Sequence, residues 1–191
     1  MMTRAMDHSP GFFDGVDTKI VESLTQTASK HLRLKVPSKA QGLEASADRF
    51  RHKVVLEKRM MALLPFHISL WQLLQTDSSK IKDKDLKSIV EDGKKRLTEN
   101  PDDFKSWRVL ASAYAYLGKL KESEDTLRTA LQRDKEFMEG WYMMGALLYG
   151  VDRLEDASNC LAQANELDSE NELLRKFYTH VSTFALVFGK K

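Results

Sequence analysis

The sequence predicts an all-α protein built as a short helical-hairpin solenoid with an N-terminal helical extension. Two observations carry this prediction. Only four prolines and nine glycines occur in 191 residues, 42% of which are hydrophobic, and this composition favours long helices. The C-terminal half also repeats its own residue pattern at a fixed spacing of 34 residues, which is the signature of a repeat architecture.

Two helices are expected before the repeats. An apolar stripe begins at Asp17, which suits an N-cap, and continues at helical spacing to Leu34, and Pro37 then ends the helix. A second, longer helix is expected over residues 38–64, where Pro65 ends or kinks it. The N-terminal region is therefore predicted to be helical but carries no pattern that identifies it.

The apolar segment 60–74 has two interpretations. Its fifteen residues are fewer than the roughly 20 that span a bilayer, and Pro65 and His67 interrupt it, so a packed core helix is favoured. The alternative is membrane attachment, because basic residues up to Arg59 precede the segment and Trp71 lies near its end.

The repeated pattern occurs in two copies. The first copy reads W-x2-L-A-x2-Y from Trp107 and continues with S-x3-L from Ser123. The second reads W-x2-M-G-x2-L from Trp141 and continues with A-x3-L from Ala157. Small residues at the matching positions let the two helices of each copy cross closely, and the short intervening loops predict antiparallel hairpins.

Both copies resemble the tetratricopeptide repeat, whose pattern is W-x2-L-G-x2-Y…A-x3-F…P. The resemblance implies two full repeats, at residues 104–137 and 138–171. Residues 86–103 have the form of the second helix of an earlier, degenerate repeat, with Ile89 and Gly93 in place of the alanine and phenylalanine.

The first helix of that degenerate repeat is expected within residues 66–75. Residues after the second repeat lack the repeat's pattern and are expected to cap the solenoid. The resulting domain assignment is a flexible tail at 1–16, an N-terminal helical region at 17–76, a linker at 77–85, repeats at 86–171 and a capping helix at 172–191.

In this family the first helices of the repeats line a concave groove that holds a peptide, so the resemblance implies a partner-binding surface. The side chains that would line it are aromatic, soft and mildly basic, which suits an apolar peptide segment with acidic flanks. The alternative for the same side chains is an ordinary solvated face. The candidate partner-binding residues are Lys105, Arg108, Ser112, Tyr116, Glu139, Tyr142, Met143 and Tyr149.

The sequence predicts no catalytic site, no cofactor and no metal site. None of the five histidines is paired at metal-binding spacing, and no nucleophile or phosphate-binding motif occurs. The single cysteine, Cys160, is expected to be a small buried apolar residue. A net charge of +2 without interleaved aromatic residues argues against nucleic-acid binding. The N-terminus has no signal-peptide pattern, so a cytoplasmic location is expected.

The predicted function is therefore a protein–protein interaction module, that is, an adaptor, an assembly factor or a chaperone-like protein that binds a partner peptide. One alternative is a self-assembling scaffold, in which the apolar segment Phe177–Phe188 drives homo-oligomers. Another is a membrane-attached factor similar to the bacterial cytochrome c assembly factors, anchored through residues 60–74.

Overall fold

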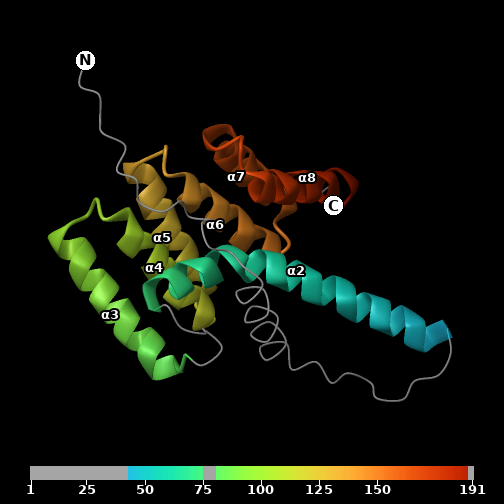
Figure 1. The fold of residues 1–191 in the computed structure, drawn as a ribbon, viewed down its shortest axis with the longest axis horizontal. Coiled ribbons are helices and arrows are strands. Elements are labelled where there is room, and N and C mark those ends of the chain that lie inside the picture. The colour runs from blue at the N-terminus through green and yellow to red at the C-terminus, as the bar shows by residue number, and fades with distance from the viewer. Residues whose placement is uncertain (1–42, 75–80, 189–191) are drawn as a thin grey trace.

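The computed structural model describes residues 43–74 and 81–188, and within these ranges every regular element is a helix (Figure 1). The all-α prediction is confirmed for this part of the chain. The expected tail at 1–16 and the expected helix at 17–34 lie outside the described residues. The helices are α2 (Leu43–Leu74), α3 (Asp83–Glu99), α4 (Phe104–Tyr116), α5 (Leu120–Arg133), α6 (Met138–Gly150), α7 (Leu154–Leu167) and α8 (Glu172–Phe188).

The 34-residue period of the sequence is also the period of the helices. The hairpins α4–α5 and α6–α7 begin at Phe104 and Met138, and their second helices begin at Leu120 and Leu154. The same period places the end of α3 at Glu99 and the start of α8 where they are observed. Thus α3 is the second helix of an incomplete repeat, and α8 is the first helix of another.

Equivalent hydrogen bonds hold equivalent places in the two hairpins. The indole of Trp107 donates to the carbonyl of Pro101 at 2.9 Å, and that of Trp141 donates to the carbonyl of Lys135 at 2.8 Å. Each tryptophan therefore ties the start of a first helix to the turn before it. Small residues permit the helix crossing, where the buried Ser123 hydroxyl donates to the Ala111 carbonyl at 2.8 Å.

The N-terminal extension differs from the sequence prediction. Pro65 does not end the helix, because α2 is one 32-residue helix that contains it. Ala62 and Phe66 on either side of the proline are both buried in the core, and this packing holds the helix together across the missing hydrogen bond. In addition, α3 begins at Asp83, inside the segment expected to be a linker.

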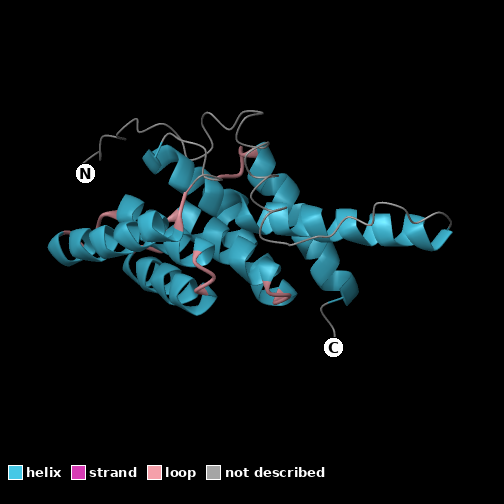
Figure 2. Cartoon of the chain, turned by 90° about the horizontal axis from the view of Figure 1, so that it is seen from below, coloured by secondary structure: helices cyan, strands magenta, loops and turns pink. Residues whose placement is uncertain are grey.

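Residues 66–74 do not form the hairpin partner of α3. They belong to the second half of α2, which packs mainly against α4 and α6. The first half of α2 projects beyond the repeats (Figures 1 and 2). None of the helices in the described ranges is both long enough and apolar enough to cross a bilayer.

Helix α8 closes the end of the stack. Its inner face buries Leu174, Phe177 and Val181. The positions that would pack against a further second helix, found by adding one period to Trp141 and its pattern, are mostly polar, and this suits a terminal helix. These positions are Arg175, Tyr178, Thr179 and Ser182.

The close crossing within the second repeat gives a stability prediction. A methyl group at Gly145 would come within 2.6 Å of the side chain of Leu161, which is fully buried, and 3.2 Å from the Ala157 carbonyl. Overpacking of this kind costs about 1–3 kcal/mol, which opposes a helix-propensity gain of about 1 kcal/mol. We expect Gly145→Ala to lower the free energy of unfolding, measured by urea denaturation.

The matched control is Gly93→Ala in α3. There the added methyl group would lie 3.4 Å from the Leu110 side chain, an ordinary contact. This variant should be as stable as the wild type or more so. An equal gain from both substitutions would show that α6 and α7 are not in close contact at Gly145.

Candidate functional site

The candidate site is the face of α4 and α6 that their hairpin partners leave uncovered, which we call the concave face. First helices alone present this face in a helical-hairpin solenoid. The second half of α2 packs against both α4 and α6 and therefore lies on it. Figure 1 shows α2 crossing the repeats in this way, so the chain carries its own helix along the surface where a partner segment was expected.

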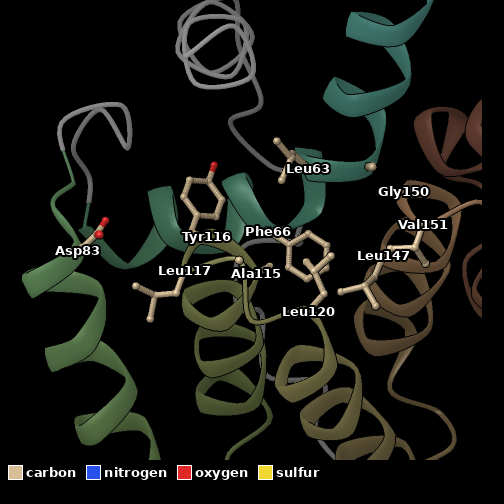
Figure 3. Close-up of a pocket in the computed structure, with 12 residues that line it drawn as sticks. Leu63, Phe66, Asp83, Ala115, Tyr116, Leu117, Leu120, Leu147, Gly150 and Val151 are labelled. Atoms are coloured by element: carbon tan, nitrogen blue, oxygen red, sulfur yellow. The ribbon is translucent and has the colours of Figure 1, made fainter. Parts of the chain in front are cut away.

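At α4, an aromatic ring and a histidine hold α2 in place. Phe66 is 1% exposed, and Figure 3 shows it reaching from α2 toward Leu147 and Leu120. The neighbouring His67 is fully buried, and its Nδ1 lies 2.6 Å from the hydroxyl oxygen of Tyr116. This hydrogen bond satisfies two polar groups at the centre of an apolar contact.

At α6, α2 makes a close backbone contact and a charged contact. Ala62 lies over Gly150, where a Cβ atom would come within 3.1 Å of the Ala62 methyl carbon. One turn earlier, the ammonium of Lys58 pairs with Asp152 and lies 5.2 Å from the ring centroid of Tyr149. The glycine thus permits the approach of α2, and the lysine fixes its position at the edge.

A cavity of about 460 Å³ remains beside α2, between the turns of the two hairpins (Figure 3). Two of its lining residues, Leu120 and Val151, are exposed by 42% and 40%. Its walls are mainly apolar, with Asp83 as the charged lining residue. The apolar part of the lining comes from Ala62, Leu63, Phe66, Ala115, Leu117, Leu147 and the two exposed residues.

Three of the eight predicted partner-binding residues form an accessible rim at the start of the first helices. Lys105 is exposed. Arg108 on α4 and Glu139 on α6 form an ion pair at 3.2 Å, which links the two repeats across the concave face. Burial lowers the pKa of the Arg108 guanidinium, and the nearby carboxylates of Glu139 and Asp103 oppose that shift.

The other five predicted residues lie deeper. Tyr116 is half-buried under α2, and Ser112, Met143 and Tyr142 are fully buried. Tyr149 is 2% exposed, and its hydroxyl oxygen lies 2.9 Å from His180 of α8. Burial raises the pKa of Tyr142, as expected for a phenol removed from water.

Helix α8 completes this part of the site. Its Phe177 meets the rings of Tyr142 and Tyr149 edge-on, at centroid distances of 5.9 and 5.6 Å. The predicted aromatic residues of the second repeat therefore form the floor of the site and support its shape. Direct contact with a partner is left to the rim and to the surface now under α2.

The residues that the sequence analysis missed are those of α2. Lys58, Ala62, Phe66 and His67 all contact the concave face. The signal available in the sequence was the apolar run 60–74, which indicated a packed helix without indicating its packing partner. The 34-residue period does not extend to this segment, so it gave no register for the contact.

Comparisons with known proteins agree with this geometry. No protein-family model matches the chain, and no curated protein does. Among solved structures, the chain is similar to the NMR structure of the first TPR domain of human RPAP3, with a TM-score of 0.50 and 18% identity. The alignment covers 65% of this chain and 92% of that domain.

The chain has the tetratricopeptide-repeat fold. The helix period, the paired tryptophan hydrogen bonds and the small residues at each crossing are the local causes of that likeness. A tetratricopeptide-repeat fold identifies the architecture alone, and function has to be argued from the site. Within the described ranges, no group of three or more His, Cys, Asp or Glu side chains is placed to hold a metal ion.

Cys160 lies outside this site, half-buried on α7. Burial raises the pKa of its thiol to about 11, with a further contribution from the charge of Asp156. A raised pKa keeps the thiol protonated at neutral pH, and the thiolate is the reactive form.

We therefore expect slow alkylation of Cys160 by iodoacetamide at pH 8, roughly a hundredfold slower than a free cysteine with a pKa of about 8.5. The rate, followed by mass spectrometry, should keep rising with pH toward about 11. Urea-unfolded protein is the control and should react like free cysteine. Fast alkylation of the folded protein at pH 8 would contradict this environment.

Proposed function

We propose that the protein is an interaction module that binds a segment of another protein on the concave face of α4 and α6. The observation that supports this most directly is the presence of α2 on that face. The surface accepts a helix along it, with an apolar centre, a hydrogen bond and a charged edge. Helix-in-groove recognition uses these same elements between chains.

The proposed contact residues are those that a partner can reach. Lys105, Arg108 and Glu139 form the rim, and Tyr116 and Tyr149 belong to the surface over which α2 now lies. Ser112, Tyr142 and Met143 are proposed to act from beneath, by holding the first helices in position, because all three are buried.

The rim gives a direct test of this proposal. Lys105→Glu with Arg108→Gln removes the positive charge that acidic residues flanking a partner segment would meet. With the full-length protein as bait in a lysate of its source cells, we expect partners captured by the wild type to fall about tenfold, which corresponds to about 1.4 kcal/mol. Quantitative mass spectrometry of the captured proteins measures the change.

The matched control carries the same two changes of charge on α5, as Lys121→Glu with Arg128→Gln. Both side chains are exposed on a second helix, which the concave face does not include. This control should retain capture at the wild-type level, and all three proteins should show the same helical circular dichroism. Equal capture by the rim variant and the wild type would remove the concave face as the binding surface.

A further inference from the structure

The contacts of α2 with the concave face follow one stripe of the helix. Starting from Lys58, the contact residues recur at intervals of about one turn, as a helical ligand in a groove requires. Each has a defined counterpart on α4 or α6, apart from Phe66 and Leu70, which enter the two apolar core clusters. The stripe consists of Lys58, Ala62, Phe66, His67 and Leu70.

This stripe amounts to a recognition pattern. It reads as a cation, a small residue four positions later, an aromatic residue and a histidine at positions eight and nine, and a leucine at position twelve. The small residue is required by Gly150, the histidine is matched by the Tyr116 hydroxyl, and the cation is matched by Asp152 and the ring of Tyr149.

Helix α2 is also attached to the repeats in the manner of a ligand. It packs mainly on two first helices that lie far from it in sequence, and its main packing is not against α3, the next helix along the chain. Its first half continues beyond the repeats (Figure 1). The same contacts would be available to a helix of another chain approaching along the same line.

We infer that α2 is the intramolecular ligand of the concave face, and that the partner is a protein helix carrying the same pattern, which replaces α2. This inference rests on the proposed function. Residues 65–70 are all buried, so a partner must restore equivalent contacts to displace them. A tethered helix also has an effective concentration in the millimolar range, so it masks any helix that lacks most of the pattern.

A disulfide that locks α2 in place tests the inference. Ala62→Cys with Gly150→Cys puts two sulfur-bearing residues at the closest contact, where the Cβ separation of 3.1 Å needs only a small shift to reach disulfide geometry. Cys160→Ser in the same full-length protein leaves no other thiol. The probe is a fluorescent peptide of residues 58–74, and fluorescence anisotropy measures its binding.

The reduced protein should bind this peptide at least about tenfold more tightly than the oxidised protein, because only the reduced protein can release α2. Equal affinity in the two states, or no binding to the reduced protein up to millimolar peptide, would overturn the inference. Mass spectrometry establishes that the disulfide has formed, and circular dichroism that both states are folded.

Lys58→Glu provides a reciprocal test that leaves the core intact, because the Lys58 side chain lies at the edge and is 25% exposed. Placed in the protein, it weakens the intramolecular helix and should tighten peptide binding severalfold. Placed in the peptide, it should weaken binding. The same direction of change in both cases would overturn the inference.

Partner capture from lysate by the locked protein separates this inference from the proposed function. Loss of capture in the oxidised state alone supports the replacement of α2. Capture that persists in the oxidised state but is lost in the rim variant would leave the interaction function standing and overturn the replacement. Capture unaffected by either change would overturn both.

Discussion

The packing of the second half of α2 on the concave face is the contact on which the rest of the structure depends. Two helical hairpins bury their shared apolar surface and leave one side of α4 and α6 uncovered. Ala62, Phe66 and Ile68 of α2 enter the same core cluster as the first helices of both repeats. Full burial of a large apolar side chain contributes roughly 1.5–3 kcal/mol, so this contact stabilises both repeats at once.

The same contact explains why a protein with two full repeats can form a closed core. Repeat proteins need terminal elements that cover exposed apolar surface, because each repeat contacts only its neighbours. Here α3 covers the start of the stack and α8 covers its end, with a polar row from Arg175 to Ser182 facing outward. Helix α2 covers the third open side, and function at that surface therefore requires either the remaining rim or movement of α2.

The repeats could be predicted from the sequence because their cause is local and periodic. Trp107 and Trp141 mark equivalent helix starts, and the small residues at each crossing recur 34 residues apart. The packing of α2 could not be predicted, since it depends on tertiary contacts between segments with no common pattern. Pro65 was wrongly expected to end or kink the helix, because packing on both sides of it outweighs the local rule. Likewise the groove residues were placed on the right helices, but the sequence gives no sign that Tyr142 and Met143 are buried.

The account stands on the position of α2, and nuclear Overhauser effects in the isotope-labelled full-length protein measure that position most directly. The decisive pair is the methyl group of Ala62 and the α protons of Gly150, which lie in direct contact across α2 and α6. We predict a strong cross-peak between them, together with one between the rings of His67 and Tyr116, whose centroids are 6.3 Å apart. Absence of both cross-peaks in a protein whose two hairpins are intact would contradict the account and return the concave face to solvent.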